Sequence, residues 1–319
     1  MAINRFGRRQ FMASVGLGAA ALAQPATIAA TTDEVPARKF YILLSLGRIG
    51  FRASFTDAMN LAVKHGFEGI DPDAAYFASL ADDDLKRLLD DLRAKKLKLG
   101  AASLPVEFRK DESMFHDGLA KLPDVAALLQ KAGVSRVSTY IMSAHQELTY
   151  LQNFRLHAQR LREVAEILKD HGQKFGLEYV GPRTVWRSQR HPFVHTLSEI
   201  RELIVAIGSS NMGVQLDSYH WFNAEETPQD ILTLRGEEVV TVDLNDAPAG
   251  LTLDQQMDLS RELPGATDVI PIQPFLESLR KIGYDGAVHA EPFNAALRSK
   301  PIDQACALTA AAMREVLNS

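Results

Sequence analysis

The chain has 319 residues, of which 46% are hydrophobic and 24% charged, and this is the composition of an ordinary globular protein. Its net charge of −5 argues against a general attraction for phosphate backbones, so no nucleic-acid partner is expected. The single cysteine, Cys306, excludes an intrachain disulfide and a thiolate metal site, which leaves oxygen and imidazole ligands for any metal.

The first thirty residues, 1–30, predict an export signal rather than a part of the fold. A basic region with Arg8 and Arg9 precedes an apolar stretch at 11–23, and small-residue cleavage patterns follow. The Arg-Arg-x-Phe-Met pattern resembles the twin-arginine type. Because the apolar stretch is shorter than the ~20 residues of a membrane span, we predict no stable membrane insertion, with an uncleaved anchor as the alternative. The expected partner is the twin-arginine export machinery, and the expected location is periplasmic or otherwise exported.

Residues 31–319 are predicted to form a single α/β domain, and their length suits one (β/α)8 TIM barrel. Eight short β-rich runs alternate with eight longer amphipathic runs, which predicts a parallel sheet closed into a barrel. An open doubly wound sheet is the alternative, but no Gly-rich dinucleotide turn follows the first strand. The predicted strands are 40–46, 68–71, 98–104, 136–142, 174–180, 212–217, 239–244 and 287–291, and the predicted helices are 55–65, 82–96, 123–132, 148–171, 197–207, 227–234, 271–282 and 302–317.

Acidic residues mark the ends of four consecutive predicted strands. In a barrel these ends converge on one mouth, where active sites form. Carboxylates held close together repel one another, and a bound divalent cation is the simplest way to neutralise this repulsion. One acidic residue at a strand end is usually a helix cap or a turn residue, so the interpretation depends on the joint pattern. The four residues are Glu178, Asp217, Asp243 and Glu291.

Several segments resemble the xylose isomerase-like barrel superfamily of sugar phosphate isomerases and epimerases, over nearly the whole of residues 31–319. The resemblance implies one divalent metal held by a Glu, an Asp, a His and a second Glu. It also implies that His220 and Arg261 bind the substrate. Carried over to this chain, the metal ligands would be Glu178, Asp217, Asp243 and Glu291. The most specific segments are 177–178, 216–220, 245–248, 261–265, 283–286 and 291–293.

Asp243 stands where the family usually has His. Asp is still a metal ligand, but an all-carboxylate set is harder and more anionic, so it favours magnesium, manganese or calcium over zinc. The family commonly uses manganese, cobalt or magnesium. We therefore expect one divalent ion, with Mn²⁺, Mg²⁺ or Co²⁺ as the first candidates.

The resemblance and the residues together predict a sugar isomerase or epimerase. The metal would polarise the carbonyl of a keto-sugar and stabilise the enediolate, while Glu178 and Glu291 act as catalytic acid and base from opposite walls. A leaving group β to the carbonyl would turn the same first step into dehydration or glycoside cleavage. Phosphorylated sugars are scarce outside the cytoplasm, and the sequence shows no phosphate-binding loop. A non-phosphorylated sugar is therefore the expected substrate.

Two other functions are weighed against this prediction. A non-catalytic sugar-binding barrel remains open because of the departure at Asp243. An abasic-site endonuclease shares the superfamily fold but uses three zinc ions and many histidines, and the second and third predicted strands end without His. A homo-oligomer is compatible with the sequence.

Overall fold

The structure is a computed structural model in which residues 35–318 are described. The predicted twin-arginine signal at residues 1–30 lies outside the described residues. Within 35–318, no helix combines the length and the apolar character that crossing a membrane requires.

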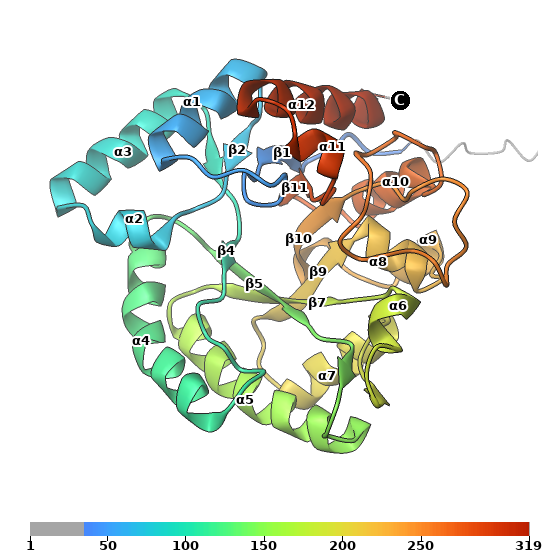
Figure 1. Cartoon of the computed structure of the whole chain (residues 1–319). Helices are drawn as coiled ribbons and strands as arrows, with labels where there is room; N and C mark the ends of the chain where they lie inside the picture. Colours follow the sequence, from blue (N-terminus) through green and yellow to red (C-terminus); the bar gives the residue numbers. More distant parts are fainter. Residues whose placement is uncertain (1–34, 319) are drawn as a thin grey trace, which may run out of the picture. The chain divides into compact units, whose positions relative to one another are not determined.

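Nine strands form one parallel sheet that curls into a barrel, as predicted (Figure 1). The sheet order is β3-β2-β1-β11-β10-β9-β7-β5-β4. A separate antiparallel pair, β6 (Ala144–His145) and β8 (His191–Pro192), joins two loops. The barrel strands are β1 (Tyr41–Leu44), β2 (Gly69–Ile70), β3 (Lys98–Leu99), β4 (Ala102–Ser103), β5 (Arg136–Ile141), β7 (Lys174–Tyr179), β9 (Met212–Asp217), β10 (Val239–Leu244) and β11 (Ala287–Ala290).

The predicted third strand, 98–104, is broken into β3 and β4 in the structure. β3 pairs with β2 and β4 pairs with β5, so this one run connects the two ends of the sheet. The break lies at Gly100 and Ala101. A Cβ on Gly100 would lie 2.3 Å from Leu43 Cδ1 of β1, so a larger residue here would require the Leu43 side chain to move.

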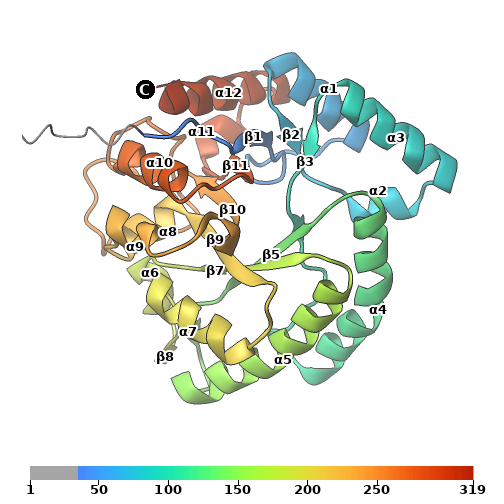
Figure 2. The same ribbon diagram turned by 180° about the vertical axis from the view of Figure 1, so that it is seen from behind.

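Helices cover the outside of the barrel, and Figure 2 shows this layer from behind. Their amphipathic faces explain the packing: in α10, the residues Ile272, Phe275, Leu276 and Leu279 recur at helical spacing and are buried. The larger helices are α1 (Phe55–His65), α3 (Asp82–Ala94), α4 (Glu112–Lys131), α5 (Tyr150–Asp170), α7 (Leu197–Ile207), α10 (Ile272–Lys281) and α12 (Ile302–Asn318).

The predicted bounds of α1 and α7 are confirmed, but α4 begins eleven residues earlier than predicted. Asp111 caps this helix by accepting a hydrogen bond from Met114 N at 2.9 Å, and the helix then runs through Pro123.

Short helices in the loops were not predicted, since they are too short to show an amphipathic pattern over three turns. They are α2 (Ala74–Ala78), α6 (Arg183–Trp186), α8 (Ser218–Asn223) and α11 (Ala295–Arg298); α9 (Pro228–Leu232) falls inside a predicted helix, and η1 (Gly236–Glu238) is a 3-10 turn.

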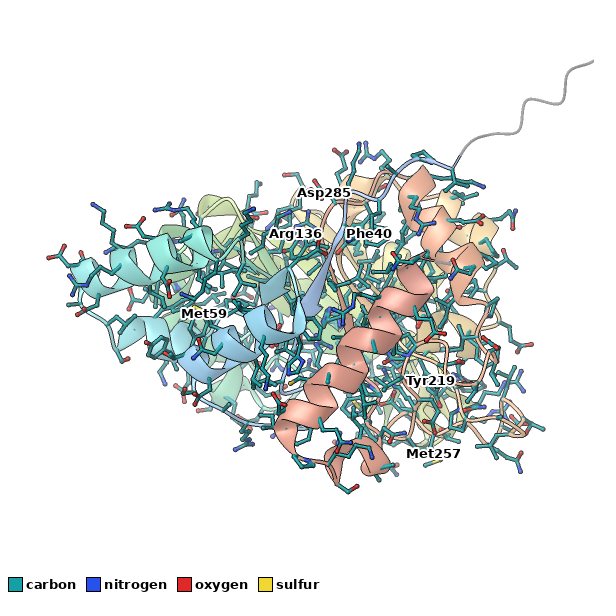
Figure 3. All side chains as sticks on the ribbon, turned by 90° about the horizontal axis from the view of Figure 1, so that it is seen from above. Phe40, Met59, Arg136, Tyr219, Met257 and Asp285 are labelled. Atoms are coloured by element: carbon teal, nitrogen blue, oxygen red, sulfur yellow. The ribbon has the colours of Figure 1, made fainter. Side chains whose placement is uncertain are left out.

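The two ends of the barrel carry different side chains (Figure 3). Arg136 and Asp285, which form an ion pair, lie at the end where the strands begin. Tyr219 and Met257 lie at the opposite end, beyond the carboxyl ends of the strands. Active sites of such barrels form at that second end, so the four acidic strand ends point to it.

Candidate active site

The four acidic residues at the strand ends come together in the structure. One carboxylate oxygen from each lies within 4.8 Å of the others. Glu178 is the last but one residue of β7, Asp217 ends β9, Asp243 lies in β10, and Glu291 directly follows β11. Neighbouring parallel strands in register produce this arrangement, because Asp243 is the register partner of Asp217 across β10 and β9.

Asp217 has a dense set of hydrogen-bond donors. It caps α8 by accepting a bond from Tyr219 N at 2.7 Å, and it accepts another from Asn245 Nδ2 at 3.1 Å. Arg261 Nη1 donates to its second oxygen at 2.7 Å. Burial opposes the charge on Asp217, but Arg261, His220 and these hydrogen bonds hold its pKa below the usual value. Asp217 is therefore an ionised carboxylate at neutral pH.

Glu291 lies between two guanidinium groups. Arg48 Nη1 donates to Oε1 at 2.7 Å, and Arg261 Nη1 approaches Oε2 at 3.2 Å. The backbone N–H of Glu291 donates to Asn245 Oδ1 at 2.7 Å. Since Asn245 also binds Asp217, this one side chain fixes the spacing of two acidic residues from different strands.

Asp243 is fully buried, and its two oxygens have different surroundings. Gln215 Nε2 donates to Oδ2 at 2.7 Å. Oδ1 accepts no hydrogen bond from the described residues, although Arg48 Nη1 lies 2.8 Å and His289 Nε2 3.1 Å from it. Burial and the charge of Arg48 hold the pKa of His289 well below its usual value, so His289 is neutral. Arg48 is therefore the cationic partner of the residue that departs from the family pattern.

Glu178 differs from the other three acidic residues because no cation of residues 35–318 lies at hydrogen-bonding distance from it. Its Oε1 atom is buried and has no hydrogen-bond partner among these described residues. Burial, together with the charges of Asp243, Glu291 and Asp217, raises its pKa well above the usual value. A buried carboxyl in this state is a candidate proton carrier.

His220 lies beside the acidic cluster rather than apart from it. Its Nε2 atom is 3.9 Å from Glu178 Oε1 and 3.9 Å from Asp217 Oδ2, and burial lowers its pKa. Glu178, Asp217 and His220 thus form a second set of ligand atoms within 4.8 Å of one another. The residue predicted to bind substrate is in a position to bind a metal as well.

The residues present fit a divalent cation. Arg48 and Arg261 bring two positive charges to four carboxylates, so at least two negative charges lack a partner when all four are ionised. The buried, unpartnered oxygen of Glu178 faces this excess. Carboxylate oxygens with one imidazole nitrogen are donors that manganese, magnesium, cobalt and zinc accept.

Three polar residues of this site were not predicted from the sequence: Arg48, Asn245 and Asp258. Arg48 and Asn245 each follow a strand end, so their position on the mouth was available as a signal. Asp258 gave no such signal, because it lies in the middle of a long loop. It accepts from Arg261 Nη2 at 2.7 Å and thereby holds the guanidinium over the cluster.

The long loop after β10, residues 246–269, is held in place by one buried carboxylate. Asp246 accepts backbone hydrogen bonds from Thr267, Asp268 and Ile270 at 2.9–3.0 Å. Its own backbone pairs with Glu262 in an isolated antiparallel bridge. The loop is thus fixed to the end of β10 and carries Arg261 to the acidic cluster.

The matched family model is described as "Xylose isomerase-like TIM barrel" and covers residues 59–315. The chain belongs to the xylose isomerase-like TIM barrel family. The fold and the family predicted from the sequence are thereby confirmed. The match leaves the predicted roles of the individual site residues as predictions.

Curated relatives of the chain are enzymes. An inosose isomerase of Bacillus velezensis is 23% identical over 248 residues, which span 74% of this chain and 82% of that protein. A 3-dehydroshikimate dehydratase of Pseudomonas aeruginosa is 25% identical over 267 residues, which span 81% of this chain but only 39% of the dehydratase. These relatives support the prediction of an isomerase or lyase.

Solved structures agree with the fold. A xylose isomerase domain protein from Alicyclobacillus acidocaldarius has a TM-score of 0.77 and 28% identity, covering 88% of this chain and 98% of its own. The structure of the IOLI protein with a binding zinc atom has a TM-score of 0.72 and 19% identity. The match covers 88% of this chain and 98% of the IOLI chain.

Proposed function

We propose that the chain is a divalent-metal-dependent isomerase or epimerase. It acts on a non-phosphorylated sugar or keto-sugar by removing a proton from the carbon next to a carbonyl. The observation that carries this proposal is the contrast between two carboxylates of one buried cluster: Glu178 has an unpartnered oxygen, whereas Glu291 is held by two arginines.

Glu178 is the better base of the two. Its oxygen is free to approach a C–H bond, and no cation at hydrogen-bonding distance lowers its proton affinity. Glu291 lies on the neighbouring wall and lines the same cavity as Glu178, a space of about 620 Å³. If Glu178 removes a proton on one side of the carbon, Glu291 can return one on the other after taking up a proton from solvent, and the configuration is inverted. Glu178 then releases its proton to solvent.

A divalent cation held in this cluster would supply Lewis-acid polarisation of the carbonyl when bound. The distances allow two ligand sets: Glu178, Asp217, Asp243 and Glu291, or Glu178, Asp217 and His220. The bound zinc of the IOLI structure, which shares this fold, supports a divalent metal, and the four carboxylates support manganese, magnesium or cobalt equally well.

Arg261 and His220 position the substrate in this proposal. Both side chains are almost fully buried and both line a cavity that reaches the two catalytic carboxylates. The Arg261 guanidinium is packed between the rings of Tyr219 and Phe293, with centroids at 4.8 and 4.9 Å. A cation fixed in this way can stabilise negative charge that develops on a substrate oxygen.

A lyase is the second candidate, because the relative from Pseudomonas aeruginosa is a dehydratase. The same proton removal by Glu178 leads to elimination when the substrate has a hydroxyl or an alkoxy group β to the carbonyl. Glu291 would then donate a proton to the departing oxygen.

The test is solvent exchange. Candidate keto-sugars and keto-glycosides are incubated in D₂O with the enzyme and Mg²⁺, and deuterium incorporation is followed by NMR. Exchange with inverted configuration supports the epimerase, and exchange with loss of a C–O substituent supports the lyase. Turnover with every C–H bond undeuterated would contradict both and favour direct hydrolysis.

We also propose export by the twin-arginine route, which rests on the sequence alone. Replacing Arg8 and Arg9 together by Lys should leave the precursor in the cytoplasm, measured by cell fractionation. Replacing Arg5 by Lys is the matched control. Normal export of the double variant would contradict this route.

A further inference from the structure

A second cavity adjoins the one already described and differs from it in chemistry. The first cavity, of about 620 Å³, is lined largely by polar groups, among them Ser45, Asp71 and Arg109. The second, of about 570 Å³, is lined largely by apolar side chains, among them Val185 and Met257. Each alone has the size of a small-molecule site, for which roughly 300–1,000 Å³ is typical.

The two cavities meet at the catalytic carboxylates. Four residues line both of them: Tyr140, Glu178, Glu291 and Phe293. A molecule that reaches from one cavity into the other must therefore pass the proposed base and acid. A monosaccharide bound in the polar cavity would leave the apolar one in contact with water.

The apolar cavity exposes large hydrophobic side chains on a backbone that is held firmly. Met257 and Leu259 are 55% and 70% exposed, in the loop that Asp246 anchors. The buried hydroxyl of Tyr219 donates to the Met257 carbonyl at 2.9 Å, and the intervening Asp258 is bound to Arg261. Exposed apolar groups on a fixed backbone at a cavity are typical of a ligand contact rather than of a mobile loop.

The junction between the cavities is aromatic. Tyr140 is 45% exposed, and Arg109 holds it by stacking at 4.0 Å from its ring centroid and by donating to its carbonyl. Phe293 has a positive φ of 42°, which is rare for a non-glycine residue. Such strained residues gather at ligand sites, where the surrounding structure holds them in place.

We infer that the substrate is amphiphilic: a hydroxylated ring that occupies the polar cavity, joined to an aromatic or alkyl group that occupies the apolar one. This inference rests on the proposed function, because it places the reacting carbon between Glu178 and Glu291. It names the substrate class as a glycoside with an apolar aglycone rather than a free monosaccharide.

The experiment measures binding and needs no turnover. Methyl and phenyl members of matched β-glycoside pairs (D-gluco, D-galacto, D-manno and D-xylo) are titrated calorimetrically into the Mg²⁺-loaded protein. For at least one ring, the phenyl member should bind about tenfold more tightly, since burying an aromatic group contributes at least this much. In the Met257→Ser, Leu259→Ser double variant, the phenyl preference should fall to about twofold while methyl binding is unchanged.

Val205→Ser is the matched control, because Val205 is 79% exposed on α7 and lines neither cavity. Three results would overturn the inference. The methyl and phenyl glycosides could bind equally, neither could bind for any of the four rings, or the phenyl preference could persist in the double variant. Sedimentation showing a wild-type dimer that the double variant dissociates would overturn it as well, since a second copy would then cover the apolar face. A phenyl preference without solvent exchange of any substrate would instead contradict the proposed function alone.

Discussion

Replacing Arg48 by Met removes the cation that lies between Asp243 and Glu291 and keeps most of the side-chain volume. Asp243 is fully buried, so water cannot solvate its charge once Arg48 is removed. Breaking a buried ion pair by removing one partner destabilises a protein by about 3–5 kcal/mol. Because Gln215 still donates to Asp243, we expect the lower end, about 3 kcal/mol. For a chain of this size, that corresponds to a fall in Tm of roughly 6 °C.

The assay is thermal unfolding of the chelated protein, with two companion variants. Asp243→Asn combined with Arg48→Met removes the uncompensated charge as well, so this double variant should recover most of the lost stability. Arg87→Met is the matched control, since Arg87 is 72% exposed and pairs with Asp84 on the same helix. Its Tm should equal that of the wild type.

Metal addition gives a second readout of the same prediction. Without Arg48, the cluster gains one unit of negative charge, so a divalent cation should bind more tightly and raise the Tm of the variant more than that of the wild type. At a concentration of 100 times Kd, the metal contributes about 2.7 kcal/mol. If Arg48→Met is no less stable than Arg87→Met, or if the double variant recovers nothing, the ion-pair reasoning is refuted.

Three further predictions concern single carboxylates. Glu291→Gln should reduce kcat/KM more than a hundredfold and lower the metal content by mass spectrometry, with an unchanged circular dichroism spectrum; full activity after EDTA treatment would contradict the metal's role. Asp243→His should shift metal preference toward zinc or cobalt in competition binding, and an unchanged order would show that Asp243 is no ligand. Burial raises the pKa of Glu226 to about 7, from 4.5, so its contribution to stability is complete below about pH 4.5 and is lost as the pH rises through about 7. In wild type, the unfolding free energy should fall between pH 5 and 8, and Glu226→Gln should reduce this fall by about 3 kcal/mol. Unfolding free energies from urea titrations that fall equally with pH in both proteins would contradict the raised pKa of Glu226.

The acidic cluster could be predicted from the sequence because it depends on local position alone. Parallel strands bring their carboxyl ends to one mouth, so a residue's place at a strand end is enough to place Glu178 or Asp217. The pairing of Arg48 with Glu291 could not be predicted in the same way. These residues are 243 positions apart, and only the reach of a long side chain from a loop brings them together.

The barrel itself follows from periodicity, but its finer breaks do not. The third strand divides at Gly100, where the Leu43 side chain of β1 leaves no room for a Cβ, and no local pattern encodes that contact. The second cavity was missed for a related reason. Met257 and Leu259 lie in a loop without regular structure, and only the tertiary hydrogen bonds of Tyr219 and Asp246 show that their backbone is fixed.

The two arginines of the cluster also separate folding from metal loading. In small zinc domains, the unfolded chain becomes ordered only when the ion arrives, so a chelator denatures the protein. Here Arg48 and Arg261 supply cations from within the chain, and the carboxylates are partly neutralised before any ion binds. The protein in a chelated sample is thus expected to remain folded and able to bind metal again. Metal exchange can then be measured as ordinary ligand binding, and the ion that is found in the site reports on the medium that surrounds the folded chain.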